Sequence, residues 1–202
     1  MRSLTLPAEP HCLTTIATVR PHGPWFDGDI PAERHCRVET RLSLLANQSN
    51  TCGWCGSKIT KASSHTDHIF PKSNPAHAAL TFAVENLIAC CGAMSCQTCG
   101  HRKGNQEVAR WIHPYHTTSL ESRFTYEIDG KMAPHTRLTD TDQIDALDAI
   151  ENILNLNDRV LKSQREALID EILNTDTYNH LTHDEVFTIV GEFKSVIEQY
   201  AP

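Results

Sequence analysis

The sequence predicts an α+β protein in which a cysteine-rich middle segment is flanked by helices and followed by a C-terminal helical region. Residues 52–99 hold two Cys-x2-Cys pairs, residues around Asp129 and Gly130 alternate as in a β-hairpin, and the last third repeats its apolar residues at helical spacing. The 202 residues suffice for one domain with a core, or for one domain plus a small module. We divide them into an N-terminal arm and helix (1–49), a cysteine-rich core (50–111), and a hairpin with a helical region (112–202).

The N-terminal arm is rich in proline and has little periodicity. We expect it to be extended, with one short strand at T-T-I-A-T-V (14–19). The next segment, P-A-E-R-H-C-R-V-E-T-R-L-S-L-L-A (31–46), suits a helix, because Pro31 fits a first helical turn and Asp29 lies near the N-cap.

The C-terminal third is predicted to be a hairpin followed by helices. Asp129-Gly130 suits a type I′ turn, which needs positive φ at both central positions. Thr182 and Glu185 have the spacing of a capping box. We expect three apolar helix faces to pack in the core: Ile144, Leu147, Ile150 and Leu154; Val160, Leu161, Leu168, Ile172 and Leu173; and Val186, Ile189, Val190, Phe193 and Ile197.

The charge of the chain is unevenly distributed. A net charge of -7 argues against a nucleic-acid binder. However, residues 50–110 carry six Lys/Arg and three Asp/Glu, whereas residues 138–202 carry four Lys/Arg and fourteen Asp/Glu. This asymmetry separates a middle segment that can face a polyanion from a tail that faces water or a protein partner.

The sequence also indicates a compartment. No apolar run approaches the length of a membrane span, and the first residues lack the apolar core of a signal peptide. We therefore expect a cytoplasmic protein without membrane contact. Since a reducing compartment disfavours disulfides, we expect Cys12 and Cys36 to be buried or idle thiols.

The two Cys-x2-Cys pairs predict a structural zinc site. Two such pairs can close one tetrahedral thiolate site that binds Zn²⁺ and does no chemistry itself. One pair alone would suggest reduced structural cysteines, but two pairs favour the metal. Cys91 is an alternative third ligand, because it also precedes the last pair. The predicted ligands are Cys52, Cys55, Cys96 and Cys99.

Residues between the two pairs include groups suited to phosphodiester chemistry. His68 can take a proton from water at neutral pH, and Asp67 offers a hard oxygen to Mg²⁺ or Mn²⁺. Asn86 can supply an amide oxygen to the same ion or hold the His68 ring in orientation. Each feature has a structural alternative: a surface hydrogen bond for the Asp-His pair, and a turn or helix cap for Asn86. His65 is expected to be an exposed loop residue without a role.

The order of these motifs resembles that of HNH (ββα-metal) endonucleases. D-H-I-F-P-K-S, E-N-L-I-A-C, C-G-H-R-K-G-N and the later I-L-N-L-N-D-R-V-L-K-S-Q-R are similar to the HNH subunit of Septu-type anti-phage systems, the PtuB-like proteins, which also occur beside some retrons. This resemblance spans residues 52–165. It implies a bacterial zinc-stapled ββα-metal nuclease core at 50–111, with His68 as general base and Asp67 and Asn86 around the catalytic ion.

One position departs from the pattern of this family. Many relatives carry His or Asn directly after the last knuckle cysteine, where this chain has Gly100. His101 or Asn105 takes the metal role, or the site works with two protein ligands. Three basic side chains are placed to hold phosphate oxygens, although such clusters are often only solvated faces: Lys72, Arg102 and Lys103.

The resemblance also implies partners. The chain contains no G-x4-G-K-[ST] P-loop, so ATP control would need a second protein. The resemblance implies an ABC/SMC-like (PtuA-like) ATPase, for which the acidic C-terminal helices are a plausible docking surface. The substrate is DNA or RNA. The alternative is a zinc-knuckle module that binds nucleic acid or protein without cleaving it.

Overall fold

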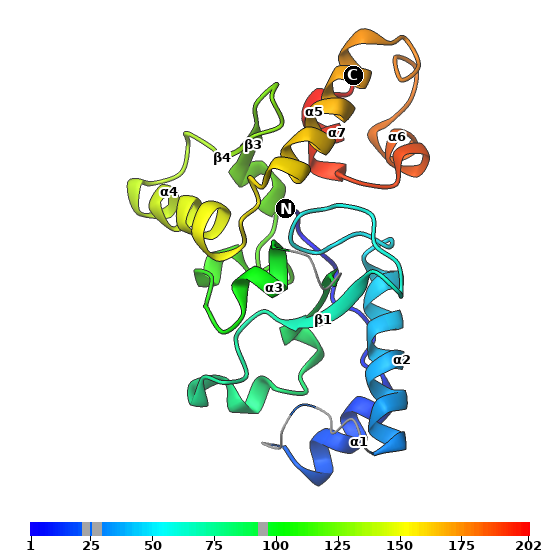
Figure 1. Cartoon of the computed structure of the whole chain (residues 1–202), viewed down its shortest axis with the longest axis vertical. Coiled ribbons are helices and arrows are strands. Elements are labelled where there is room, and N and C mark those ends of the chain that lie inside the picture. The colour runs from blue at the N-terminus through cyan, green and yellow to red at the C-terminus, as the bar shows by residue number, and fades with distance from the viewer. Residues whose placement is uncertain (22–24, 26–29, 93–96) are drawn as a thin grey trace.

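The computed structural model describes residues 1–21, 25, 30–92 and 97–202, and it shows a mixed α+β chain. The molecule is elongated, with helix α1 (His11–Val19) at one end and α5 (Arg159–Asn174), α6 (His183–Val190) and α7 (Lys194–Tyr200) at the other (Figure 1). A small sheet and the cysteine-rich loops lie between them.

The central sheet consists of two antiparallel strands, β1 (Ser64–His68) and β2 (Leu87–Cys91), with His65 opposite Cys90 and Asp67 opposite Ile88. The 18-residue connection between them contains two 3-10 turns, η1 (Pro75–Leu80) and η2 (Val84–Asn86). The short helix α3 (Cys99–Lys103) follows β2 in the chain and contacts it. This arrangement brings the segments predicted to carry chemistry to one place.

Helix α2 (Pro31–Asn47) agrees with the predicted helix at 31–46, and it is anchored to the sheet by Gln48. The Gln48 side-chain amide donates to the Ala89 carbonyl and accepts from the Ala89 N–H, both at 2.8 Å. The N-cap residue is Ile30, and Asp29 lies outside the described residues.

The strand predicted at T-T-I-A-T-V is wrong, because these residues belong to helix α1. Leu13 and Thr14 donate their backbone N–H groups to the Pro10 carbonyl, which starts the helix. Leu13 is fully buried, and α1 packs on α2. Tertiary packing therefore overrides the β propensity of the threonine-rich segment.

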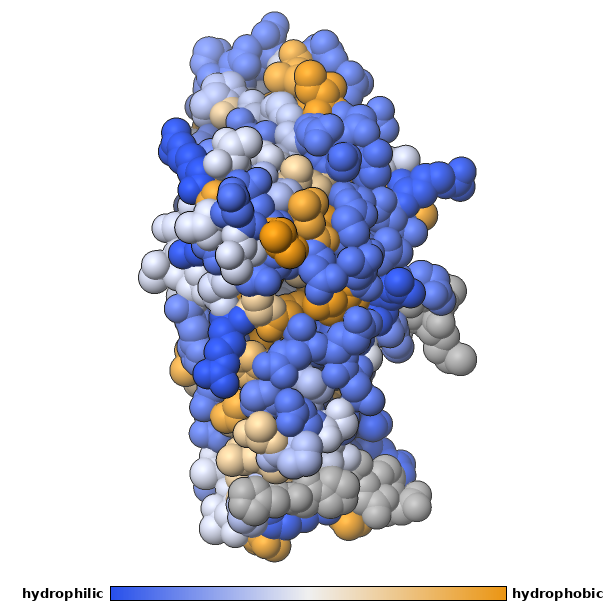
Figure 2. Space-filling view, turned by 90° about the vertical axis from the view of Figure 1, so that its left-hand side faces the viewer, coloured by the Kyte–Doolittle hydropathy of each residue, from blue (hydrophilic) through white to orange (hydrophobic). Residues whose placement is uncertain are grey.

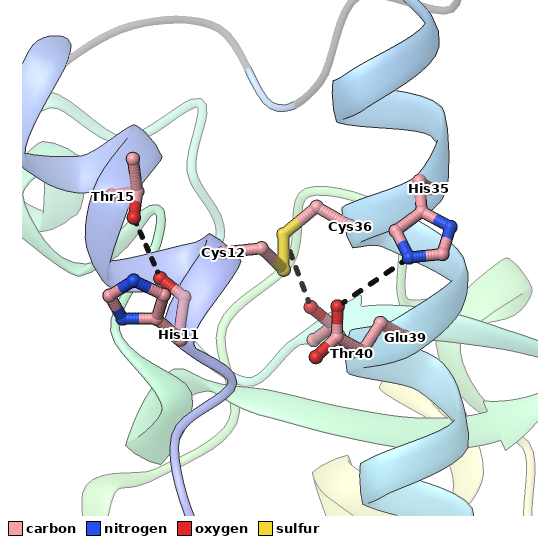
Figure 3. Close-up of a disulfide and its surroundings, with 7 residues drawn as sticks. All are labelled: His11, Cys12, Thr15, His35, Cys36, Glu39 and Thr40. Carbon is pink, nitrogen blue, oxygen red and sulfur yellow. Dashed lines mark hydrogen bonds and ion pairs between the residues drawn. A yellow bond between two sulfur atoms is a disulfide. The ribbon is translucent and has the colours of Figure 1, made fainter.

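Cys12 and Cys36 form a disulfide that joins α1 to α2, which corrects the prediction of idle thiols (Figure 3). Cys36 is fully buried, and its sulfur lies 4.0 Å from Thr40 Oγ1, one turn along α2. The prediction assumed that a reducing compartment keeps these cysteines as free thiols. The helix pairing instead brings these two thiols to bonding distance.

The hairpin predicted around Asp129 and Gly130 is present as β3 (Phe124–Tyr126) and β4 (Met132–Pro134). Among its turn residues, Gly130 has positive φ, at 75°, and Asp129 does not. The Gly130 N–H donates to the Glu127 carbonyl. The turn is therefore not type I′; it resembles a type I turn followed by a left-handed glycine.

The C-terminal third is helical, as predicted. It contains α4 (Asp140–Leu147), a π-helical turn η5 (Asp148–Ile153) and then α5, α6 and α7. The Thr182–Glu185 capping box is present at the start of α6. The apolar run at 182–197 forms two helices, because Gly191 ends α6 with a φ of 77°.

The predicted apolar faces of these helices are only partly buried. Ile150, Leu154, Leu161, Leu168 and Ile172 are in the core. Five of the predicted core residues are exposed instead, because each helix covers the core with a narrow stripe: Ile144, Leu147, Val160, Leu173 and Ile189. Scattered apolar patches of this kind interrupt an otherwise hydrophilic face in Figure 2. In the described part of the chain, no helix combines the length and apolar character needed to cross a membrane.

Candidate functional site

Four cysteine sulfurs gather in the middle of the molecule. Cys52 and Cys55 come from the loop before β1, Cys91 ends β2, and Cys99 begins α3. Their sulfur atoms all lie within 4.8 Å of one another, with 3.7 Å between Cys52 and Cys99 and 3.5 Å between Cys55 and Cys91. The alternative ligand Cys91 completes this cluster, and the preferred Cys96 lies outside the described residues.

The backbone around these cysteines is held by local hydrogen bonds. The Cys52 N–H donates to the Ser57 carbonyl, and the Gly56 N–H donates to the Cys52 carbonyl. Gly56 has a φ of 82°, a value that favours glycine and lets the loop turn tightly. The Cys99 N–H donates to the Leu154 carbonyl at 2.8 Å, which fixes the start of α3 against the helical region.

The cluster fits a zinc ion. A tetrahedral site with Zn–S bonds of ~2.3 Å has sulfurs ~3.8 Å apart, close to the observed separations. Hydrogen bonds from the neighbouring thiols, that of Cys52 first, hold the pKa of the Cys55 thiol well below its usual range. The same hydrogen bonding raises the pKa of Cys99, since a second thiolate would stand beside the first. A bound cation would remove this conflict, so Cys52, Cys55, Cys91 and Cys99 are the residues that would hold zinc.

Asp67 and His68 lie at the end of β1, beside the cysteine cluster. The Asp67 carboxylate accepts a hydrogen bond of 3.0 Å from Trp54 Nε1 and lies 3.6 Å from Lys103 Nζ. Trp54 stands between Cys52 and Cys55 in the chain, so the cysteine loop directly positions this carboxylate. Asp67 is 9% exposed. Its buried carboxylate is surrounded by one neutral donor, Trp54, and one positive charge, Lys103.

The His68 imidazole is held in one orientation. Its Nε2 lies 3.0 Å from the Thr81 carbonyl oxygen, which can only accept, so Nε2 carries the proton and Nδ1 keeps a lone pair. The ring is 5% exposed and makes an edge contact with Trp25, at 4.6 Å between ring centroids. Burial lowers the pKa of His68 to about 4, so the ring is neutral at neutral pH.

Asn86 has a positioning role. Its side-chain oxygen accepts from the Phe70 N–H at 2.7 Å, and its nitrogen donates to the Phe70 and Leu80 carbonyls at 3.0 and 3.1 Å. Asn86 is 1% exposed. Because the amide is used by the backbone, it does not fit the predicted metal-ligand role. The predicted turn role agrees better, since these bonds fix the backbone of the loop after His68, and none of them reaches the His68 ring.

Two histidines lie next to Asp67 on the side of α3. The His65 and His101 rings are 4.4 Å apart, and His65 Nε2 is 3.4 Å from the buried Cys90 sulfur. Burial lowers the pKa of His65. His65 was predicted to be a loop residue without a role, yet it lies in β1, two residues before Asp67. Side chains two residues apart in a strand share a face, and this signal could have placed His65 on the same face as Asp67.

The three basic residues predicted to hold phosphate differ in exposure. Lys72 and Arg102 are exposed, and Arg102 Nε donates to the Asn152 carbonyl at 3.3 Å. Lys103 is 1% exposed, and its ammonium donates to the His68 carbonyl at 2.7 Å. Its predicted phosphate contact therefore does not agree with the structure, where it braces the end of β1. Asn105, the other candidate ligand beyond α3, is exposed.

Part of the chain resembles a segment of a known protein. No family model matches the chain. A segment of 81 residues, 40% of the chain, is 35% identical to part of the CRISPR-associated endonuclease Cas9 of Corynebacterium diphtheriae. The matched segment spans only 6% of that protein. The likeness therefore links part of this chain to a small part of an endonuclease.

Proposed function

We propose that this protein is a metal-dependent HNH-type endonuclease that hydrolyses phosphodiester bonds. The observation that carries the proposal is the neutral His68 imidazole, whose Nε2–H is fixed on the Thr81 carbonyl and whose Nδ1 is unprotonated, directly after Asp67 in one strand. The order of the motifs and the partial likeness to an endonuclease support the same function.

The chemistry assigns one step to each side chain. His68 Nδ1 takes a proton from the attacking water, whose oxygen forms a bond to phosphorus while the bond to the leaving oxygen breaks and that oxygen takes a proton from a second water. Asp67 would hold a divalent ion, Mg²⁺ or Mn²⁺, which supplies charge stabilisation at the scissile phosphate. The exposed Lys72 and Arg102 would hold neighbouring phosphate oxygens. Asn86 and Lys103 keep the end of β1 and the following loop in place.

The burial of His68 favours a second candidate. The ring is 5% exposed, and Trp25 contacts its edge, so water and substrate do not reach Nδ1 freely in this conformation. A zinc-stapled module that binds nucleic acid or protein without cleaving it needs no such access. The two candidates differ in whether a cleaved product forms at all.

A cleavage assay on the full chain separates the two candidates. The chain is purified alone and together with the product of the neighbouring gene, then incubated with DNA and RNA in the presence of Mg²⁺ or Mn²⁺. His68→Ala should lower cleavage by ~10² or more, which is the usual contribution of a general base. His35→Ala is the matched control, because its side chain is 81% exposed on α2.

The outcomes are distinct when folding and zinc content are equal. Cleavage by wild type and by His35→Ala, but not by His68→Ala, supports the nuclease. Undiminished cleavage by His68→Ala removes the general-base role. Binding of nucleic acid without cleavage in every condition supports the non-cleaving module.

We also propose that the protein acts as the effector subunit of an anti-phage defence complex of the PtuB-like kind, with an ABC/SMC-like ATPase as partner. The acidic residues 138–202 would face the ATPase, since they repel a polyanionic substrate. Reversing Asp142 and Asp148 to Lys should weaken co-purification with the ATPase. Asp145 is left intact, because it accepts a hydrogen bond from Trp111 at 3.2 Å. Unchanged co-purification contradicts this docking surface.

A further inference from the structure

Gly100, the residue after the last cysteine of the cluster, lies where three other side chains converge. A Cβ atom at this position would be 2.7 Å from Cys90 Sγ, 2.8 Å from His65 Nε2 and 2.9 Å from Asp67 Cγ. Contacts this short force neighbouring atoms to move, so a larger residue is excluded in this packing. The space beside Asp67 is occupied by the His65 imidazole.

We propose that His65, Asp67 and His101 together hold the divalent ion, with His65 supplying the ligand that position 100 cannot. The proposal rests on the proposed nuclease function, because it names the ligands of the ion that cleavage requires. The three residues combine two imidazoles and one carboxylate. This is a donor set that binds first-row divalent metals in proteins.

The backbone directs these three side chains to one place. His65 and Asp67 are two residues apart in β1, so they project from the same face of the strand. Both come close to the position of a Gly100 Cβ, which shows that this face looks toward the start of α3. His101 follows Gly100 in α3, and its ring lies 4.4 Å from that of His65.

The exposure of the three proposed ligands increases from Asp67 to His101, as an accessible ion site requires. Asp67 is buried, His65 is half-buried, and His101 is exposed. An ion bound between them would therefore be fixed from the inside by the strand and reached from the outside past His101. A phosphate oxygen could approach from that same open side.

The set is more open than the zinc site. Across the residues that the structure describes, the four cysteines are the only group of at least three potential ligand atoms that all lie within 4.8 Å of one another. The His65 set must therefore draw together around an ion. The exposed His101 side chain has the freedom to turn inward, whereas His65 and Asp67 are held by the strand. The ion consequently binds here more weakly than zinc binds the four thiolates.

The donor set also selects the metal. Mg²⁺ prefers oxygen ligands and keeps much of its water, whereas imidazole nitrogen suits transition metals better. With two imidazoles and one carboxylate, the site prefers Mn²⁺ to Mg²⁺. A site formed by Asp67 alone with water and phosphate oxygens would show little such preference.

The contact between His65 and Cys90 offers a competing explanation, in which His65 only packs against a buried thiol. Cys90→Ala separates the two explanations, because it removes the sulfur that lies 3.4 Å from His65 Nε2 and leaves the proposed ligands intact. A packing role for His65 predicts equal effects of Cys90→Ala and His65→Ala. A ligand role predicts a loss of ion affinity in His65→Ala alone.

The experiment measures Mn²⁺ binding rather than cleavage. The full chain is loaded with zinc, freed of excess metal and titrated with Mn²⁺, while electron paramagnetic resonance measures the free ion. Trp54 donates to Asp67 Oδ2, so tryptophan fluorescence, to which Trp25 and Trp111 also contribute, gives a second signal. The variants are His65→Ala, Cys90→Ala and the exposed control His35→Ala, each with its zinc content and thermal unfolding recorded.

Wild type, His35→Ala and Cys90→Ala are expected to bind Mn²⁺ alike, and His65→Ala at least ~10-fold more weakly. Mg²⁺ should displace Mn²⁺ only at a concentration ~10-fold higher or more. Wild-type affinity in His65→Ala overturns the proposal, as does a wild-type chain that binds no Mn²⁺. If wild type cleaves nucleic acid but His65→Ala binds Mn²⁺ as tightly as wild type does, only the assignment of the ligands is overturned. If Mn²⁺ binding depends on His65 but no cleavage is detected, the nuclease function is overturned and the proposed metal site is retained.

Discussion

Reduction of the Cys12–Cys36 disulfide is expected to lower the free energy of unfolding by about 3.5 kcal/mol. The bond closes a loop with a sequence separation of 24 residues. In the chain-entropy description, such a cross-link lowers the entropy of the unfolded chain by about 11.6 cal/mol/K, which corresponds to about 3.5 kcal/mol at 25 °C. Reduction leaves every side chain in place, so the folded packing around Leu13 and Cys36 changes little.

The measurement compares oxidised and reduced wild-type protein in urea and in thermal unfolding. For a chain of this length, the expected loss corresponds to a fall in the midpoint temperature of roughly 7–14 °C. Zinc is kept present throughout, so that the proposed zinc site stays saturated while the reductant acts on the disulfide. The Cys12→Ala/Cys36→Ala variant is the matched control, because a reductant should leave its unfolding unchanged.

Two results would refute this reasoning. If oxidised and reduced wild type unfold together, the cross-link does not restrict the unfolded chain as calculated. If alkylation of the denatured, unreduced protein modifies Cys12 and Cys36, the bond is absent and the two helices meet without it.

Two further perturbations test the cysteine cluster and the neighbouring His68. Cys91→Ala should remove the zinc, whereas Cys90→Ala should keep about one ion per chain by metal analysis; equal zinc contents contradict the assignment. Since the pKa of His68 is lowered to about 4, the acid limb of cleavage at saturating Mn²⁺ should have its midpoint near that pH, and a midpoint near ~6.5 that persists as Mn²⁺ is raised contradicts it. The folded-state pKa lies below the unfolded value, so the stability contributed by neutral His68 is complete above ~6.5 and is lost as pH falls toward 4. In urea unfolding, His68→Ala should lack this contribution of up to ~3 kcal/mol, while the similar loss from His113, whose pKa burial also lowers to about 4, remains.

Local signals predicted several elements correctly. Pro31 and the apolar spacing after it identified α2, and the Thr182–Glu185 box identified the start of α6. Alternation around Asp129 and Gly130 identified the hairpin, although its turn type was wrong. These features depend on neighbours within about four residues, which a single sequence contains.

Features that depend on distant contacts were not predicted. The threonine-rich segment 14–19 is helical because Leu13 and Cys12 are held on α2, 24 residues further along the chain. Lys103 has the composition of a phosphate contact but reaches inward to the His68 carbonyl. Ile144 and Ile189 continue an apolar pattern yet face solvent, because the pattern does not reveal how wide a stripe the neighbouring helices cover.

The candidate site shows the same division between local and distant contacts, and helix α3 links the cysteine cluster to the proposed catalytic residues. Helix α3 has only five residues, too few to persist alone in water. Its first residue, Cys99, belongs to the zinc cluster, its second, Gly100, sits against Asp67, and its last, Lys103, bonds the His68 carbonyl. Zinc bound by the cluster would therefore act on the proposed chemistry indirectly, by holding this short helix where Gly100 approaches β1 so closely that no side chain fits. The absence of a ligand side chain at position 100 is thus a consequence of that contact. The imidazole beside Asp67 belongs instead to His65 of the facing strand β1.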